Sequence, residues 1–112
     1  MEKTEVITAL AALAHEARLD IFRLLVQAGP EGLPAGQIAQ TIGLAAPTAS
    51  FHLAQLKQAG LVLCRRESRS LIYSAAFDRM TGLVGFLTEN CCGGNPAGCG
   101  LPPLGSPDTC HD

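Results

Sequence analysis

The sequence has few aromatic residues and no long apolar run. Aromatic residues make up 4 % of its 112 residues and Trp is absent, whereas hydrophobic residues reach 47 %. The core must therefore be built from Ala, Leu, Ile and Val, which suits packed helices. No apolar run approaches the roughly 18 residues of a membrane span, and Glu2 and Glu5 lie where a secretory signal peptide would avoid acids. We expect a single domain located in the cytoplasm, with no membrane contact.

The arrangements that carry catalysis are also missing. There is no Ser/His/Asp arrangement, no carboxylate pair and no phosphate-binding loop, and a C-x-x-C motif in a βαβ setting is absent. These absences argue against a thiol oxidoreductase and against an enzyme in general. We expect no organic cofactor.

An excess of positive charge is missing overall, because the net charge is −2. The distribution of charge is uneven, however. Residues 46–73 contain a single acid, Glu67, and four basic residues: Lys57, Arg65, Arg66 and Arg69. Since contact with phosphates requires a local concentration of positive charge, this segment indicates a nucleic-acid partner.

Residues 3–90 show the apolar spacing of helices. The pattern predicts a first helix over residues 5–14 and a second, central helix over residues 15–28. The second helix has a core-facing stripe that Leu19 and Phe22 widen: Ala17, Ile21, Leu24, Leu25 and Ala28. A short helix from Pro34 to the stop at Gly43, followed closely by a helix over residues 47–59, has the shape of a helix-turn-helix.

A hairpin and a last helix follow. Residues 61–64 and 71–73 are short β-type runs, and the polar residues between them form a turn, so together they predict a wing. Asp78 is a suitable N-cap for a last helix that extends to about Asn90. We therefore predict a mainly α fold with a small β-hairpin, that is, a winged helix-turn-helix domain over residues 1–90. Residues 91–112 are rich in Cys, Gly and Pro, and we expect them to order only on docking or ligand binding.

The helix over residues 47–59 has one face suited to reading DNA. On a helical wheel its core side carries Ala49, Leu53 and Leu56. The opposite side can contact base edges in the major groove and includes Thr48, Phe51, Gln55 and, at its border, His52. Contacts to the DNA backbone or a minor groove are expected from Ser50, Lys57, Arg65, Arg66 and Arg69. For His52, a role as a capping or core-edge histidine is an equal alternative.

Three strings of residues carry a family resemblance over about residues 5–90. The run AAPTASFHLAQLKQAGLV, preceded by LAHEARLDIFRLL and followed by RRESRSLIYS, resembles the ArsR/SmtB family of bacterial metalloregulatory repressors. The resemblance implies a homodimer formed through the first and last helices. It also implies that the helix over residues 47–59 binds double-stranded operator DNA, and that the DNA is released when an inducer binds.

Two inducer sites of the family are absent here. Members that sense metal at the first helix of the helix-turn-helix carry cysteines near its start, but residues 33–38 contain none. Members that bind zinc on the last helix use Asp and His ligands, and the last helix of this chain offers Asp78 and Glu89 but no His. Inducer binding is therefore expected elsewhere.

The remaining candidate is a cluster of three cysteines, Cys91, Cys92 and Cys99. Soft thiolates select soft ions. Adjacent cysteines converge only in irregular backbone, which Gly93 and Gly94 permit. Three thiolates without an equal fourth ligand fit the pyramidal geometry of As(III) or Sb(III) better than tetrahedral zinc. Some arsenic-sensing members of the family are similar in having a vicinal pair and a third cysteine after the last helix, which implies a site at these residues.

Several alternatives stay open. Cys110 and His111 can complete a tetrahedral zinc or cadmium site, and the thiols can form a redox switch. Cys91 and Cys92 alone can bind methylarsenite instead of arsenite or antimonite. A thiol-rich metal carrier would explain the tail but not the helix-turn-helix. The role of Cys64, and whether one chain or two form each site, are not determined by the sequence.

Overall fold

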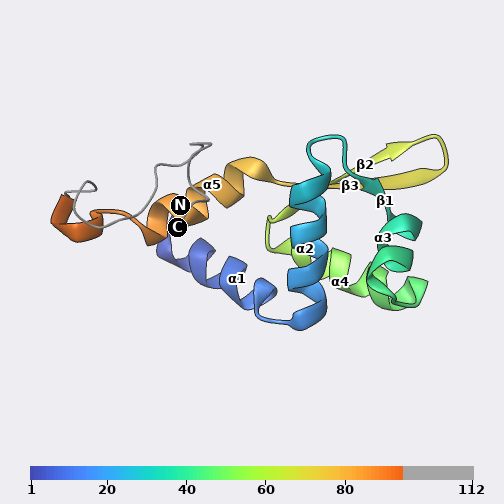
Figure 1. The fold of residues 1–112 in the computed structure, drawn as a ribbon, viewed down its shortest axis with the longest axis horizontal. Coiled ribbons are helices and arrows are strands. Elements are labelled where there is room, and N and C mark those ends of the chain that lie inside the picture. The colour runs from blue at the N-terminus through green and yellow to red at the C-terminus, as the bar shows by residue number, and fades with distance from the viewer. Residues whose placement is uncertain (95–112) are drawn as a thin grey trace, which may run out of the picture.

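The structure is a computed structural model that describes residues 1–94, and these residues form helices around a small antiparallel sheet (Figure 1). The elements in chain order are α1 (Lys3–Leu13), α2 (Glu16–Ala28), β1 (Leu33–Pro34), α3 (Ala35–Ile42), α4 (Ala46–Gln58), β2 (Val62–Glu67), β3 (Ser70–Ala75), α5 (Phe77–Leu87) and a short 3₁₀ turn (Cys91–Gly94). This arrangement confirms the predicted mainly α fold with a β-hairpin. Within residues 1–94, no helix is both long enough and apolar enough to span a bilayer.

Local chemistry explains where the helices begin and end. The ring Nδ1 of His15 accepts the backbone N–H of Ala17 at 3.1 Å, so His15 is the N-cap of α2 and not its first residue. Gly43 adopts the left-handed conformation that ends α3 (φ 85°). The prediction that Asp78 caps the last helix is wrong. Ala76 is the N-cap of α5, and Asp78 lies in its first turn, where an acid still interacts favourably with the helix dipole.

The sheet has the order β1-β3-β2, and both pairings are antiparallel. We call β2, β3 and the turn between them the wing. Its register runs from Val62 opposite Ala75 to Glu67 opposite Ser70, so it is longer than the predicted hairpin. Strand β1, which the sequence did not predict, pairs Leu33 with Tyr73.

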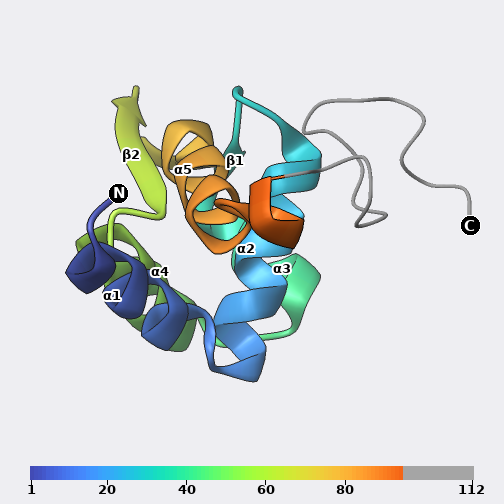
Figure 2. The same ribbon diagram turned by 90° about the vertical axis from the view of Figure 1, so that its left-hand side faces the viewer.

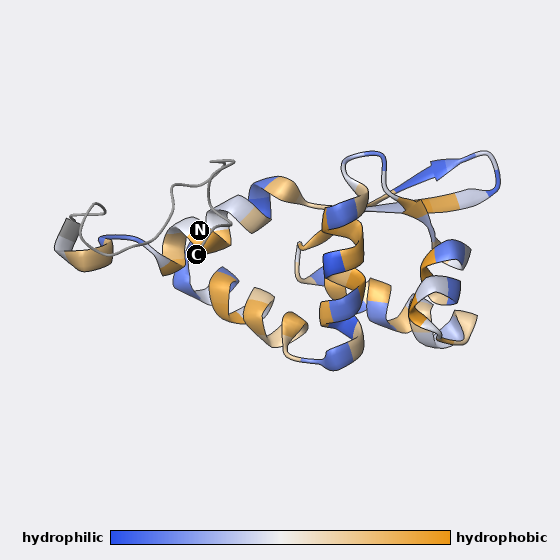
Figure 3. Ribbon diagram, viewed as in Figure 1, coloured by the Kyte–Doolittle hydropathy of each residue, from blue (hydrophilic) through white to orange (hydrophobic). Residues whose placement is uncertain are grey.

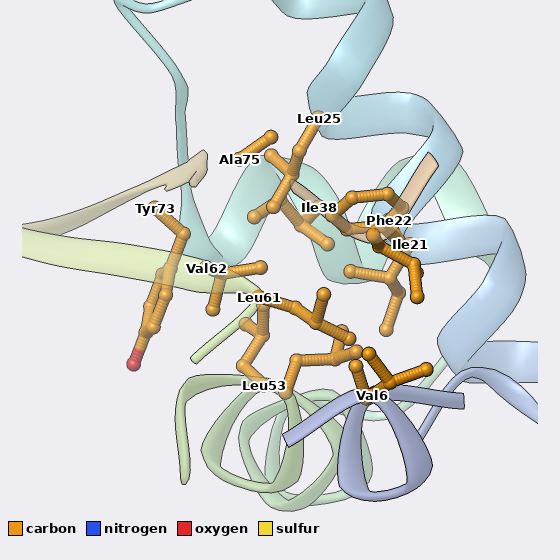
Figure 4. Packing of buried hydrophobic residues seen from close by; sticks show 13 residues of the cluster. Val6, Ile21, Phe22, Leu25, Ile38, Leu53, Leu61, Val62, Tyr73 and Ala75 are labelled. Carbon is orange, nitrogen blue, oxygen red and sulfur yellow. The ribbon is translucent and has the colours of Figure 1, made fainter. Parts of the chain in front are cut away.

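A single hydrophobic core lies where α1, α2, α3 and α4 meet the base of the sheet (Figure 4). Ile21 and Leu25 of α2 are fully buried there, as predicted, and Phe22 is nearly so. Leu19 is 43 % exposed, so the prediction that it widens the core stripe is wrong. It precedes Ile21 by two residues, and about 200° of helical rotation turns its side chain away from the core.

The two ends of the molecule differ in composition. Helices α1 and α5 contact each other at one end, which faces the viewer in Figure 2. The ion pair between Arg79 Nη1 and Glu5 Oε2, at 3.4 Å, joins them. The wing lies at the other end, and much of β2 is hydrophilic (Figure 3).

Candidate nucleic-acid interface

Helix α4 has a buried face and an exposed face, as the helical wheel predicts. Ala49, Leu53 and Leu56 are at most 1 % exposed and hold the helix against the core. The exposed or partly exposed side chains that were predicted to contact DNA are Thr48, Ser50, Phe51, Gln55 and Lys57. Phe51 is 57 % exposed, and the centroid of its ring lies 5.5 Å from that of His52.

Helix α3 precedes α4 closely and packs against it, so the two form a helix-turn-helix. Pro47 in the first turn of α4 favours helix initiation, because a missing N–H costs nothing there. After α4 the chain turns through Gly60, which adopts a φ of 81° that side-chain-bearing residues rarely take. The wing therefore follows α4 directly.

The three wing arginines are in different situations. Arg65 Nε donates to Glu67 Oε2 at 2.8 Å, and Arg65 Nη2 donates to the carbonyl oxygen of Glu31 at 2.8 Å. Arg65 thus ties the wing to the loop between α2 and β1. Arg66 and Arg69 are exposed and form no ion pair within residues 1–94, so their guanidinium groups are available to phosphates.

His52 does not share the exposed face of α4. It is only 7 % exposed, and its Nδ1 lies 3.3 Å from Nη1 of Arg18. Its ring also packs 4.7 Å from the ring of His15. Burial lowers the pKa of His52 below its ordinary value of 6.5, and the positive charges of His15 and Arg18 lower it further. This geometry is that of a core-edge histidine, and the prediction that His52 contacts DNA stays untested.

The vicinal cysteines follow α5. Cys92 adopts a left-handed conformation (φ 54°, ψ 37°), and the Cys91 and Cys92 Sγ atoms lie 3.7 Å apart. The two thiols converge through irregular backbone, as expected from the sequence. Cys99, Cys110 and His111 lie outside the described residues. Within residues 1–94 there is no group of three His, Cys, Asp or Glu side chains that could hold a metal ion, so the three-thiolate site stays a prediction.

Cys64 lies in β2 directly opposite Tyr73 of β3 and is partly buried. The pKa of Tyr73 is raised, first by burial and then by its hydrogen bond with Cys64. The sequence indicated no such pairing, because the two residues are brought together by the register of the hairpin.

Helices α1 and α5 lie at the end of the molecule opposite the wing and contain many hydrophobic residues (Figure 3). Ile7 and Leu87 are each 59 % exposed, and Leu10 is 41 % exposed. Such a patch on a small domain is a typical subunit contact, and it lies on the two helices predicted to form the dimer.

Comparison with known proteins places the chain among regulators. A helix-turn-helix domain model matches residues 13–65. The chain is 39 % identical over 77 residues to the uncharacterised HTH-type transcriptional regulator YceK of Bacillus subtilis, covering 68 % of this chain and 76 % of YceK. It is 36 % identical to the biofilm growth-associated repressor of Agrobacterium fabrum, covering 75 % and 71 % of the two chains.

A solved structure is similar as well. The homodimeric winged helix-turn-helix DNA-binding domain of Mb0332 from Mycobacterium bovis, a possible ArsR-family transcriptional regulator, superposes with a TM-score of 0.63 at 34 % identity. The match covers 78 % of this chain and 81 % of that domain.

Proposed function

The chain belongs to the ArsR/SmtB family of winged helix-turn-helix transcriptional regulators, and we propose that it is a repressor released from its operator by trivalent arsenic or antimony. The proposal that the chain binds DNA rests on one observation, the exposed polar face of α4 beside a basic wing. The proposal for the inducer rests on the convergence of the Cys91 and Cys92 thiols just after α5.

The DNA contacts follow from what α4 and the wing leave exposed. Thr48 and Gln55 can hydrogen-bond base edges, and Phe51 can pack on a thymine methyl group when α4 enters the major groove. Lys57 lies near the end of the same helix, Arg66 and Arg69 follow in the wing, and these three side chains supply the phosphate contacts. The negative net charge of the whole chain does not oppose this binding, because every acid except Glu67 lies outside residues 46–73.

The active form is a homodimer that uses α1 and α5. The exposed side chains of Ile7, Leu10 and Leu87 support this contact, and the similar Mb0332 domain is homodimeric. A dimer of winged helices presents two copies of α4 to successive major grooves, so a palindromic operator is expected.

The inducer is held by Cys91, Cys92 and Cys99. Thiolates bind soft ions, and three of them suit the pyramidal geometry of As(III) or Sb(III). Because the ligands must be deprotonated, binding releases protons and weakens at low pH. The cysteines follow α5, which is part of the proposed dimer contact, so binding changes how the two α4 helices are spaced. Couplings of this kind are typically about 1–3 kcal/mol, or roughly 5- to 150-fold in affinity.

Fluorescence anisotropy with a labelled operator tests both parts. Arsenite is titrated into wild type, Cys91→Ser and Cys99→Ser, with Cys110→Ser as a matched control in the same segment. We expect arsenite to release wild type and Cys110→Ser from DNA, and to leave the other two variants bound. Parallel titrations with antimonite and methylarsenite rank the inducers. Release that does not depend on Cys99 would contradict the three-thiolate site and favour the two-thiol site for methylarsenite.

A redox response is the second candidate, since thiols 3.7 Å apart are close enough to react with each other. Peroxide would take two electrons and two protons from the pair and leave a disulfide. Release by peroxide, zinc or cadmium but not by arsenite would leave the repressor function intact and reject the metalloid inducer.

A further inference from the structure

A cluster of three basic side chains lies between α4 and the corner where α1 meets α2, and its members are His15, Arg18 and His52. We propose that His52 is a positioning residue, whose contact with Arg18 holds the recognition helix α4 in the orientation that operator binding requires. This inference rests on the proposed function, namely that α4 binds DNA. It assigns His52 a role different from the base contact expected from the sequence.

Arg18 connects three helices through one guanidinium group. It belongs to α2; its Nε donates to the carbonyl oxygen of Ala12 in α1 at 2.7 Å, and its Nη1 donates to Nδ1 of His52 in α4 at 3.3 Å. The guanidinium is planar and its donors have a fixed geometry. A change in the position of α1, one of the two proposed dimer helices, is therefore transmitted to α4 by a direct contact.

The contact requires one protonation state of His52. Arginine donates hydrogen bonds and cannot accept them, so Nδ1 of His52 must be the acceptor and the proton of the neutral ring must be on Nε2. A protonated imidazolium has no free lone pair on Nδ1 and would place one donor against another. Acid therefore breaks the contact between Arg18 and His52.

The ionisable groups that face His52 are both basic. They are Arg18 within α2 and His15 at the N-cap of the same helix, and no acid among the described residues affects the titration of His52. Burial first, and then repulsion from these two basic groups, lowers the pKa of His52, so its ring is neutral at pH 7. The contact is complete above pH 6.5 and is lost as the pH falls below that value through the lowered pKa.

Apolar burial alone does not determine the rotation of α4 about its axis. Leu53, Leu56 and Ala49 are buried on the core side, but the hydrophobic effect has no direction. A hydrogen bond weakens steeply as its angle departs from linear. The contact of His52 with Arg18, a polar contact on the buried side of α4, is therefore suited to set which residues face outward.

The pH dependence of DNA affinity distinguishes positioning from direct contact. If His52 touched a phosphate, its protonation would add a positive charge and strengthen binding in acid. If it positions α4, protonation weakens binding. Operator affinity is measured by anisotropy from about pH 8 to about pH 5 at constant ionic strength. The probes are a labelled duplex from the region upstream of the chain's own gene and a scrambled duplex of equal length.

Substitutions of His52 and Arg18 distinguish the loss of the hydrogen-bond acceptor from the loss of the titratable imidazole ring. His52→Asn keeps an acceptor near the position of Nδ1 but does not titrate, so we expect near wild-type affinity at pH 8 and no selective loss in acid. His52→Leu and Arg18→Met each remove the hydrogen bond, and we expect each to lose about tenfold in specific affinity. Their double variant should lose little more, because both substitutions remove the same contact. Arg23→Met is the control, since Arg23 is exposed on α2 and carries the same charge as Arg18.

Two further measurements complete the test. Nitrogen NMR of the histidine rings should show the Nε2–H tautomer for His52, and this measurement needs no DNA. His15→Asn keeps an N-cap for α2 and should retain the acid loss. Thermal unfolding shows that each variant is folded at the temperature of the assay.

The outcomes are distinguishable. Stronger specific binding in acid for wild type but not for His52→Asn would overturn positioning in favour of phosphate contact. Equal affinities for Arg18→Met, His52→Leu and Arg23→Met, or an acid loss abolished by His15→Asn, would also overturn it. If wild type does not prefer its own duplex over the scrambled one at any pH, the proposed function fails, and the inference fails with it.

Discussion

At the residue scale, two glycines of the same loop differ in how much space their surroundings leave for a side chain. Gly29 and Gly32 both have positive φ values, of 86° and 73°. A Cβ on Gly29 would meet no atom within 4 Å, whereas a Cβ on Gly32 would clash with the backbone carbonyl group of Tyr73. The short strand β1 begins at Leu33, so the close approach of Gly32 to β3 is what allows β1 to pair.

This contrast makes a prediction with a matched control. Gly29 combines its φ of 86° with a ψ of −173°, a region that residues with a side chain rarely enter, so we expect Gly29→Ala to cost about 2 kcal/mol of unfolding free energy. Gly32→Ala adds a backbone clash to a positive φ and should cost more, about 4 kcal/mol. Urea denaturation of both variants measures the difference. Equal losses would mean that the chain relaxes at Gly32 without disturbing β1.

At the scale of elements, strand β2 of the wing carries one arginine that is bonded to other parts of the protein and one that is available to DNA. Arg65 is engaged with Glu67 and with the carbonyl of Glu31, while the neighbouring Arg66 is exposed. Alternation along a strand places adjacent side chains on opposite faces, so the two arginines cannot have the same surroundings. The sequence identified the basic wing but treated its three arginines alike.

The wing arginines should differ in the salt dependence of DNA binding. Each phosphate contact contributes about 0.9 to the slope of log affinity against log salt concentration. We expect Arg66→Ala and Arg69→Ala each to reduce this slope by about that amount. Arg65→Ala should change it less, because its guanidinium is already committed to protein acceptors. Anisotropy at several salt concentrations measures the three slopes, and a largest change for Arg65→Ala would contradict the assignment.

The helices show which of their boundaries can be predicted from the local pattern of apolar residues. The positions of α2, α3 and α4 follow the predicted spacing to within a residue or two at their ends. Helix α5 ends at Leu87 rather than near Asn90, because Asn90 and Cys92 adopt left-handed conformations that a helix cannot continue through. That same irregular segment brings the Cys91 and Cys92 thiols together.

At the scale of the whole molecule, the positive charge and the proposed dimer contact lie on different elements. Positive charge is concentrated in residues 46–73, at α4 and the wing, whereas α1 and α5 carry the exposed side chains of Ile7, Leu10 and Leu87. Exposed apolar side chains also occur on α4 and the wing, at Phe51, Leu63 and Leu71. The two surfaces suit two partners, DNA and a second copy of the chain. A link between them is supplied by Arg18, which contacts both α1 and α4.

The apolar surface gives a prediction about assembly. Leu10→Glu places a charge in the proposed dimer contact and should raise the dimer dissociation constant about tenfold or more. Leu19→Glu is the control, because Leu19 is exposed to a similar degree, 43 % against 41 %, but lies on α2. Sedimentation equilibrium measures both. Equal assembly of the two variants would remove α1 from the proposed contact.

Apolar spacing and turn residues act over a few positions of the chain, so local patterns were sufficient to predict the helices, the core residues of α2 and α4, and the hairpin. The remaining features depend on tertiary packing. The contact of Arg18 with His52 and that of Arg65 with Glu31 each join residues 34 positions apart, and the pairing of β1 with β3 spans a similar separation. No local pattern specifies such partners, since they depend on how the helices pack around Ile21, Leu25 and Leu53. His52 lies at the border of the helical wheel, and only the packing of α4 against α2 decides that it faces Arg18.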